Sequence, residues 1–231
     1  METTDKFNGD ILDNLRTNDL LDNSIIVITA DHGEEFMEEG YFGHSPASSS
    51  DRILHVPLIF YGPNILQPMN ISVPVSTIDI LPTICDLLGV CIPDSNRGIS
   101  LKELLLHKHE NLKEDAEFWR RPIFSEAWET KGLLDRDPGH DSNRKIFTVR
   151  KGKHKLKVAQ RKKNENTIQE DFELSNWINN EKLDTRSNSR IVEELNHLLD
   201  EHIRVEGASA IRIRNRAEKQ RIRKALNKIR D

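Results

Sequence analysis

The sequence is poor in several features that define large classes of protein. It has only two cysteines, Cys85 and Cys91, and their spacing matches neither a disulfide framework nor a metal-binding motif. No run of about 18 apolar residues is present, so no membrane-spanning helix is expected. The opening METTDKFNGD lacks the basic and apolar regions of a secretory signal. We therefore expect reduced thiols and a cytoplasmic protein with no membrane association.

Length and charge allow one large domain, or one domain with an appendage. Of the 231 residues, 36% are hydrophobic, which is adequate for a buried core. The net charge of −4 is unevenly spread, because ten Lys or Arg stand against three acids from Arg204 to the end. This basic stretch has no aromatic residues to stack on bases, and we do not expect nucleic acid as a partner.

The first part of the chain has the pattern of an α/β fold. Residues 10–22 carry apolar side chains at helical spacing, and residues 24–30 form a short apolar run typical of a buried strand. Residues 56–61 form a second such run, and residues 78–88 predict a helix closed by Gly89. The order of these elements favours a parallel or mixed sheet with helices.

The pattern changes after about residue 94. The expected elements are a short helix at 101–106, a polar, loop-rich stretch at 107–143, a hairpin at 145–158 around a Lys-Gly turn, a short strand at 172–174 and an amphipathic helix at 190–203. We therefore divide the chain into an α/β catalytic-type portion (1–106), a polar insert or linker (107–143), a small antiparallel α+β subdomain (144–203) and a basic helical tail (204–231).

Candidate chemistry lies directly after the first expected strand. In open α/β sheets, polar residues at the carboxyl end of a strand are placed where ligands bind, so Asp31 and His32 are the first candidates. A carboxylate oxygen suits calcium, magnesium or manganese, and Gly33 allows a close turn. The alternatives are that Asp31 caps a following helix and that His32 is an ordinary loop histidine. His44 could reach the same site or face solvent.

Several blocks taken together resemble the C-terminal half of a sulfatase catalytic domain, within the alkaline phosphatase superfamily. In chain order they are IIVITADHGEE at 25–35, GH at 43–44, HVPLIFYGPNI at 55–65, VSTIDILPTICDLLGV at 75–90 and RGISL at 97–101. More loosely, IFTVRKGKHKLKV and the stretch from DFEL to ELNHLLDEH resemble the strand pair and closing helix of the sulfatase C-terminal subdomain.

The resemblance implies a fold, a reaction and a site. The fold is a partial sulfatase-like mixed sheet with helices, followed by the small α+β subdomain. Asp31 and His32 are two ligands of a divalent metal, calcium or magnesium with manganese as a third candidate, although many sulfatases have Asn at the place of His32. His44 is the catalytic and substrate-binding residue that contacts the sulfate or leaving-group oxygen. The metal acts as Lewis acid while a formylglycine hydrate attacks sulfur.

One departure from the family is as informative as the match. Sulfatases carry their nucleophile in a C-x-P-x-R or S-x-P-x-R motif, and neither occurs in this sequence. A metal held by Asp31 and His32 alone has too few ligands, so we expect weak binding. The two apolar runs are typical of strands covered on both faces. Without the elements that cover them in a full sulfatase, they should leave apolar surface exposed. We expect a chain that is inactive alone, or completed by a separate N-terminal chain or by oligomerisation.

Two other functions fit part of the pattern. A phosphoester or phosphonate hydrolase, or a transferase, of the same superfamily also places DHG before GH, although the RGISL block favours a sulfatase. A non-catalytic interaction protein would keep the fold fragment and present its basic tail to a partner. The sulfatase interpretation, with a sulfate ester as substrate, is the one we carry forward.

Overall fold

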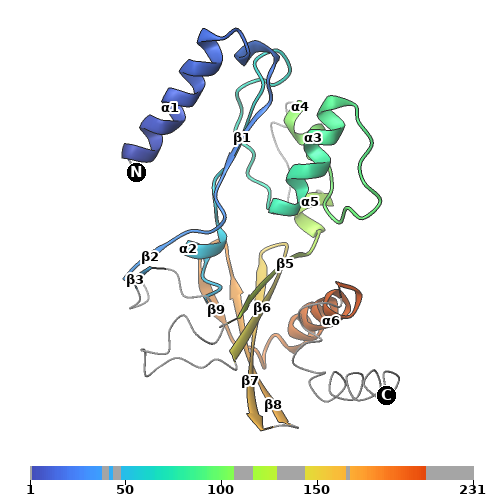
Figure 1. Ribbon diagram of the computed structural model, residues 1–231. Coiled ribbons are helices and arrows are strands. Elements are labelled where there is room, and N and C mark those ends of the chain that lie inside the picture. The colour runs from blue at the N-terminus through green and yellow to red at the C-terminus, as the bar shows by residue number, and fades with distance from the viewer. Residues whose placement is uncertain are drawn as a thin grey trace, which may run out of the picture. The chain divides into compact units, whose positions relative to one another are not determined.

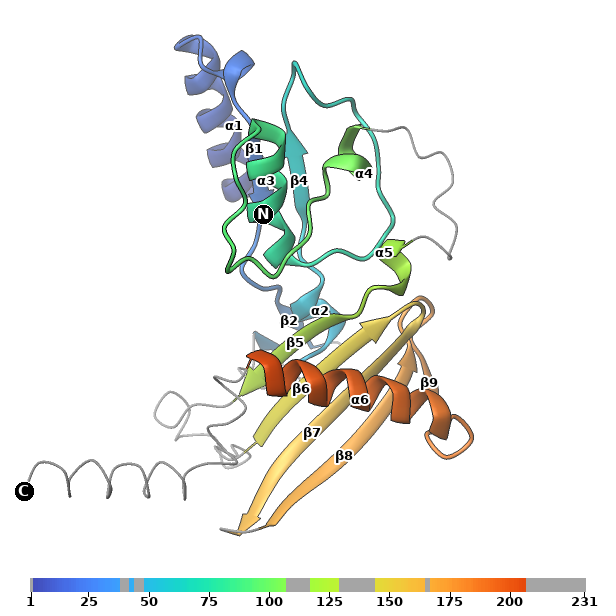
Figure 2. The same cartoon turned by 90° about the vertical axis from the view of Figure 1, so that its right-hand side faces the viewer.

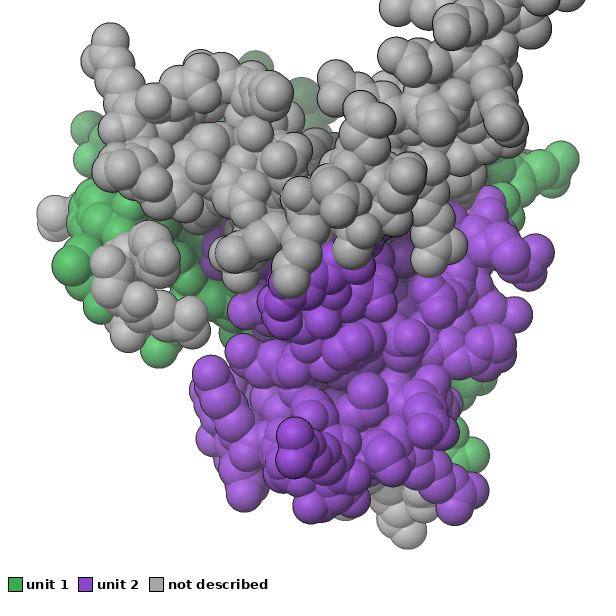
Figure 3. All heavy atoms as spheres, turned by 90° about the horizontal axis from the view of Figure 1, so that it is seen from below, with its two compact units in different colours: residues 1–44, 50–121 green, residues 45–49, 122–231 purple. Residues whose placement is uncertain are grey.

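The computed structural model describes residues 2–37, 42–43, 48–106, 117–128, 144–164 and 167–206 (Figure 1). The chain divides into two compact units, which are coloured separately in Figure 3. Unit 1 is residues 1–44 with 50–121, and unit 2 is residues 45–49 with 122–231. Across the described ranges, no helix is both long enough and apolar enough to cross a bilayer. The four-part division drawn from the sequence stays a prediction.

Unit 1 combines helices with two short antiparallel strand pairs. Its elements are α1 (Glu2–Thr17), the 3-10 helix η1 (Leu21–Asn23), β1 (Ile26–Thr29), β2 (Glu35–Phe36), β3 (Phe42–Gly43), α2 (Asp51–Leu54), β4 (Leu58–Tyr61), the 3-10 helix η2 (Thr77–Asp79), α3 (Ile80–Leu88), α4 (Lys102–Leu106) and α5 (Glu117–Arg120). β1 pairs antiparallel with β4, and β2 with β3. Both strands expected from the apolar runs are present, and their pairing is antiparallel.

The core of unit 1 lies on one face of the β1–β4 pair. Val73, Leu101 and Leu104 are buried together, and Leu58 and Phe60 of β4 pack against them. The alternation along β4 follows from strand geometry, since neighbouring side chains point to opposite faces. β4 therefore places every second residue in the core and leaves the others outside it.

Helix α3 ends as its sequence predicts. Gly89 adopts the left-handed conformation with φ +67°, which a glycine adopts without steric cost. The Gly89 N–H donates to Asp86 O, and the Val90 N–H donates to Cys85 O at 2.9 Å, which satisfies carbonyls at the end of the helix. Cys85 is buried, Cys91 is exposed, and both are free thiols.

Helix α1 lies further toward the N-terminus than expected. The sequence predicted a helix over 10–22, whereas α1 spans Glu2–Thr17 and a separate 3-10 turn follows. Asp19 has a φ of +56°, a left-handed conformation that cannot continue a right-handed helix. The apolar pair at 20–21 therefore belongs to the connection into β1, and the periodicity alone could not show this break.

The described residues of unit 2 form an antiparallel five-stranded sheet with one long helix. The strands are β5 (Ile123–Trp128), β6 (Arg144–Lys151), β7 (His154–Asn164), β8 (Thr167–Asn176) and β9 (Glu181–Leu183), in that order across the sheet. Helix α6 (Ser189–Glu206) lies across one face of this sheet (Figure 2). The structure confirms the expected β6–β7 hairpin, whose turn contains Gly152 at φ +56°.

Alternate residues of three strands form the core of unit 2 with α6. The buried cluster consists of Phe147, Val149, Leu156, Val158, Leu174, Leu195 and Leu199. Leu195 and Leu199 lie four residues apart on α6, so both fall on the helix face that covers the sheet. The arrangement contains the hairpin predicted from the alternation at 145–158 and the amphipathic helix predicted at 190–203.

The stretch at 107–143 contains two elements that the sequence analysis missed. α5 and β5 lie within this expected polar, loop-rich insert, and β5 pairs along its length with β6. β5 escaped notice because, among the described strands, it lies at the edge of the sheet and only its Phe124 packs against the α6 core cluster. Residues 129–143, and the basic tail beyond 206, lie outside the described residues.

Candidate functional site

The two metal-ligand candidates from the sequence lie side by side after β1. Asp31 and His32 follow the end of β1 at Thr29 by two and three residues. The Asp31 carboxylate is 88% exposed and the His32 ring is 37% exposed. Asp31 Oδ2 and His32 Nε2 are 3.7 Å apart. The turn therefore presents an acid and an imidazole together at the edge of unit 1.

Gly33 fixes this turn through a close backbone approach. A Cβ at this position would lie 1.8 Å from the carbonyl oxygen of Arg52, so only glycine fits without a shift of the backbone. The Gly33 N–H also donates to Ile53 O at 2.9 Å. Because Arg52 and Ile53 belong to α2, this short helix supports the loop that carries Asp31 and His32.

The His32 ring is oriented by its own loop. Nδ1 lies 2.9 Å from Gly33 O. A carbonyl only accepts, so this hydrogen bond requires the proton on Nδ1 and makes Nε2 the basic nitrogen of the neutral ring. Metal-bound histidines are held in the same way, with the other ring N–H donated to a carbonyl or carboxylate. The His32 tautomer therefore suits a ligand that binds through Nε2.

The alternative that Asp31 caps a helix does not fit the structure. Asp31 Oδ1 accepts the backbone N–H of His32 at 3.0 Å, and the element that follows is strand β2 rather than a helix. The other oxygen, Oδ2, is the atom near His32 Nε2. One carboxylate oxygen thus orders the turn while the second lies at the exposed edge.

A single divalent cation can touch both side chains. Metal–oxygen and metal–nitrogen bonds of about 2.3 and 2.1 Å sum to about 4.4 Å, which exceeds the 3.7 Å separation of Oδ2 and Nε2. However, within the described ranges no group of three or more His, Cys, Asp or Glu could hold a metal ion. His44, the third candidate, lies outside the described residues. Asp31 and His32 therefore fit as part of a donor set and do not complete one.

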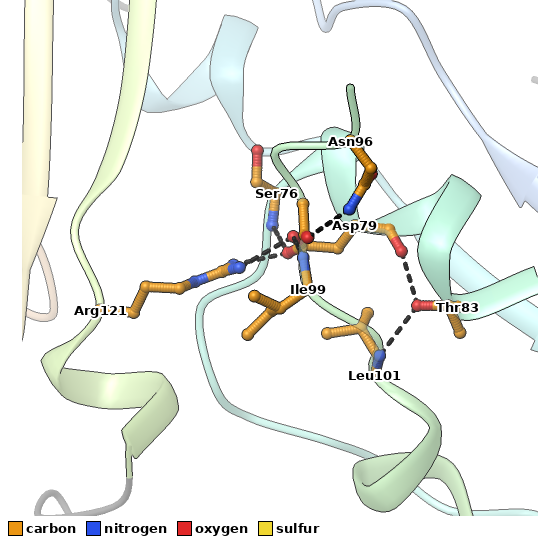
Figure 4. A network of polar contacts seen from close by, with 8 residues as sticks. Ser76, Asp79, Thr83, Asn96, Ile99, Leu101 and Arg121 are labelled. Atoms are coloured by element: carbon orange, nitrogen blue, oxygen red, sulfur yellow. Dashed lines mark hydrogen bonds and ion pairs between the residues drawn. The ribbon is translucent and has the colours of Figure 1, made fainter. Parts of the chain in front are cut away.

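A second polar cluster in unit 1 centres on Asp79, which is fully buried (Figure 4). Arg121 donates to both carboxylate oxygens, from Nη1 to Oδ1 at 2.8 Å and from Nη2 to Oδ2 at 2.5 Å. The backbone N–H groups of Ser76 and Ile99 donate to the same carboxylate at 2.8 and 3.0 Å. A buried charge with this many donors is well compensated.

The same cluster fastens the RGISL block to α3. Thr83 donates its hydroxyl to Asp79 O at 2.6 Å and accepts the Leu101 N–H at 2.9 Å. A Cβ on Gly98 would lie 2.0 Å from Ile78 O, so this position requires glycine. Residues 98–101 are thereby held against the start of α3, which explains the glycine of the motif.

Asp86 of α3 forms a further set of polar contacts, with Ser100 and with Lys102 at the start of α4. Ser100 Oγ donates to Asp86 Oδ2 at 2.7 Å, and Lys102 Nζ donates to Oδ1 at 3.0 Å and to the Asp86 carbonyl oxygen at 2.9 Å. The Ser100 hydrogen bond, followed by that of Lys102, holds the pKa of Asp86 below its ordinary value of 3.8. Sequence reasoning missed the Asp79 network, because its partner Arg121 lies in the stretch expected to be loop.

Known proteins share both the sequence blocks and the fold. Residues 1–90 match the model of the sulfatase family. Arylsulfatase K of Mus musculus is 34% identical over 152 residues. These matches indicate a partial sulfatase-family domain in this chain. The matched region is 66% of this chain and 25% of arylsulfatase K, so the match spans about a quarter of that relative's length.

Solved structures show the sulfatase-type fold over most of the chain. BT4656, solved with its substrate D-glucosamine-2-N,6-O-disulfate, superposes with a TM-score of 0.60 at 22% identity, over 85% of this chain and 37% of that one. The phosphonate monoester hydrolase SpPMH from Silicibacter pomeroyi gives 0.59 at 23% identity, over 87% and 38%. The expected α/β fold, a partial sulfatase and alkaline-phosphatase-like domain, is therefore confirmed.

Proposed function

We propose that this chain contributes part of the active site of a metal-dependent sulfuric ester hydrolase. The observation that supports the proposal most is the pairing of Asp31 Oδ2 and His32 Nε2 at 3.7 Å on a loop fixed by Gly33. In this proposal Asp31 and His32 are two ligands of a divalent metal, calcium or magnesium, with manganese as a third candidate. The substrate is a sulfate ester.

Each residue has a separate task. The metal, when bound, withdraws charge from a sulfate oxygen as a Lewis acid. Asp31 supplies the anionic ligand, and its second oxygen holds the turn through the His32 N–H. His32 offers Nε2 because Nδ1 is engaged by Gly33 O. His44 donates a hydrogen bond to the sulfate or leaving-group oxygen, so that charge developing there is stabilised.

The chain requires further groups for turnover. It has no C-x-P-x-R or S-x-P-x-R motif, and the described residues offer two candidate ligands where calcium takes six to eight. We propose that the attacking group and the remaining ligands come from another chain segment, in the same polypeptide or in a complementing chain. Metal affinity of the chain by itself is then weak, with a Kd of about 1 mM or higher.

Metal titration of the purified chain tests the ligand assignment. Manganese binding, followed by electron paramagnetic resonance, is expected to weaken in Asp31→Asn and to stay unchanged in Asp94→Asn, a matched exposed acid in the same unit. Calcium and magnesium are then compared by competition. Equal affinities of the two variants for manganese would remove Asp31 from the site.

An aryl sulfate assay tests the requirement for completion. The chain alone is expected to give no turnover above background, because the nucleophile motif is missing. Turnover by the chain alone that disappears in Asp31→Ala would overturn the claim of incompleteness while supporting the site.

A phosphonate or phosphoester hydrolase is the second candidate, and the likeness to SpPMH favours it. Both reactions place a tetrahedral anion against a metal, so the ligand pair does not distinguish them. The completed enzyme does so directly, when matched aryl sulfate and phenylphosphonate esters with the same leaving group are compared by kcat/KM. The sulfatase proposal expects the larger value for the sulfate.

A further inference from the structure

Unit 2 contains a buried lysine on the face of its sheet opposite α6. Lys155 lies on β7 next to Leu156, which is part of the core cluster under α6, so the alternation of side chains along a strand places Lys155 on the other face. Lys155 is only 8% exposed. Lysine is rarely buried to this extent unless its ammonium group is paired, because removing a charge from water is costly. The position therefore requires specific partners.

One partner of this ammonium group is a backbone carbonyl distant in the sequence. Lys155 Nζ donates to Ser49 O at 2.9 Å, across 106 positions. Ser49 is 4% exposed, and its hydroxyl has no hydrogen-bond partner among the described residues. A hydrogen bond from a charged donor is stronger than one between neutral groups. Lys155 therefore holds Ser49 firmly, and through the main chain rather than the side chain.

The carbonyl of Ser49 lies where the chain passes from one unit to the other. Residues 45–49 belong to unit 2, and unit 1 resumes at Ser50. Ser50 is the residue from which α2 starts, and its carbonyl oxygen accepts the N–H of Ile53 at 3.1 Å. Ile53 O in turn accepts the N–H of Gly33 at 2.9 Å. A continuous series of contacts therefore leads from Ser49 to residues 31–33, which we call the ligand loop.

We infer that Lys155 is a positioning residue for the proposed metal site, and that it acts through Ser49 and α2 on the ligand loop. α2 has only four residues, and a single helical turn is not stable in water, so its place depends on contacts with the rest of the chain. Lys155 supplies such a contact at the residue before the helix start. The inference rests on the proposed function, because only there are Asp31 and His32 metal ligands.

A role confined to the stability of unit 2 is the alternative. In that case Lys155 would stabilise the β6–β7 hairpin and leave the ligand loop unaffected. Lys157 provides the comparison, since it lies two residues further along β7 and on the same face. Its side chain is 29% exposed, and its Nζ lies 4.0 Å from Glu173 Oε2 on β8. Lys157→Met is therefore the matched control for Lys155→Met.

Amide hydrogen exchange, measured by two-dimensional NMR on the full chain, tests the inference. In Lys155→Met the Gly33 N–H is expected to exchange about tenfold faster or more, because α2 loses an anchor. The Val90 N–H at the end of α3, in the same unit, should be unaffected, and Lys157→Met should change neither amide. Unchanged exchange at Gly33, an equal acceleration at Val90, or equal changes in the two variants would overturn the inference.

The fold of the hairpin is checked in the same spectra. Protected amides in β6 and β7 show that Lys155→Met is folded, and the long apolar side chain of Met keeps most of the buried volume of Lys. If the hairpin unfolds, Lys155→Gln replaces this variant. Its amide is uncharged and one bond shorter than the lysine side chain, so it should break the contact with Ser49 and give the same result at Gly33.

Manganese affinity is a second readout, which a role confined to unit 2 would not change. Loss of a positive charge by itself favours cation binding, so weaker binding would report lost order of the ligands. We expect the Kd for manganese to rise about threefold or more in Lys155→Met and to stay unchanged in Lys157→Met. An equal or tighter affinity in Lys155→Met would contradict the inference.

Asp31→Asn separates this inference from the proposed function. If Lys155→Met releases Gly33 while manganese binding by the wild-type chain does not depend on Asp31, the proposed function fails and the action of Lys155 on the loop stands. If manganese binding depends on Asp31 while exchange at Gly33 is the same in Lys155→Met as in the wild type, the inference fails and the function stands.

Discussion

Replacement of Asp79 by Asn is the sharpest test of what holds unit 1 together. Asp79 is completely buried, and its carboxylate accepts from Arg121 Nη1 and Nη2 and from two backbone N–H groups. Asn has the same shape but carries no charge. It keeps one acceptor oxygen and turns an NH2 group toward donors that previously faced an oxygen.

The size of the effect follows from Arg121. Its side chain is 17% exposed, so the substitution leaves a largely buried guanidinium without its counter-charge. Removal of one partner from a buried ion pair costs about 3–5 kcal/mol. Single domains are stable by about 5–15 kcal/mol, so we expect Asp79→Asn to remove a large fraction of the stability of unit 1. Residues 98–101 should separate from α3 first, since the Ile99 N–H loses its acceptor.

Native-state hydrogen exchange with peptide resolution reports each unit separately. We expect faster exchange in peptides from η2, α3 and residues 98–101, and unchanged exchange in β6 and β7 of unit 2. Asp86→Asn is the control, because Asp86 is partly exposed and should have a smaller effect. The double variant Asp79→Leu/Arg121→Met should lose less than the sum of the single losses. A loss below about 1 kcal/mol for Asp79→Asn, or additive losses, would refute the reasoning.

Three further variants test other parts of the structure. Gly33→Ala should destabilise unit 1 by about 1–3 kcal/mol and weaken manganese binding, because the new Cβ would collide with the Arg52 carbonyl. Denaturant unfolding and metal titration check this, and wild-type stability with wild-type manganese affinity would contradict it. Burial, and then Lys153, holds the pKa of His154 below 6.5, so the folded state binds fewer protons than the unfolded state and stability falls as pH drops below about 6.5. His154→Gln should reduce this loss of stability between about pH 7 and 5.5 in urea titrations, and an unchanged loss would contradict the prediction. Leu199→Ala should cost unit 2 about 2–5 kcal/mol by calorimetry, whereas a loss under about 1 kcal/mol would mean that the α6 core is not tightly packed.

Local pattern was sufficient for the elements that bury a regular set of side chains. Alternation at 145–158 predicted the β6–β7 hairpin, and the helical stripe at 190–203 predicted α6. Both patterns arise because each element packs one face on a core, so apolar residues recur at the side-chain spacing of a strand or a helix. Gly89 likewise marked the end of α3, since a left-handed residue is required there.

Elements that depend on distant partners gave no such signal. Arg121 forms its ion pair with Asp79 across 42 positions of sequence, so no local pattern around Arg121 indicates this contact. In the part of the chain that the structure describes, β5 lies at the edge of its sheet and contributes only Phe124 to packing against the core cluster. In both cases the stabilising contact is non-local, so no window of a few residues contains it.

The candidate metal site shows the same division between local and distant contributions. The orientation of the two candidate ligands depends on neighbouring residues, because Asp31 Oδ1 and Gly33 O orient His32 and the close approach to Arg52 fixes the turn. Further ligands would have to come from residues distant in the sequence, and the described residues supply too few of them. In the proposed site, metal affinity would depend on the number of donors more than on the order of the two donors present. Oxygen ligands supplied by another chain segment would then join a pair whose orientation is already fixed, and metal affinity should rise steeply.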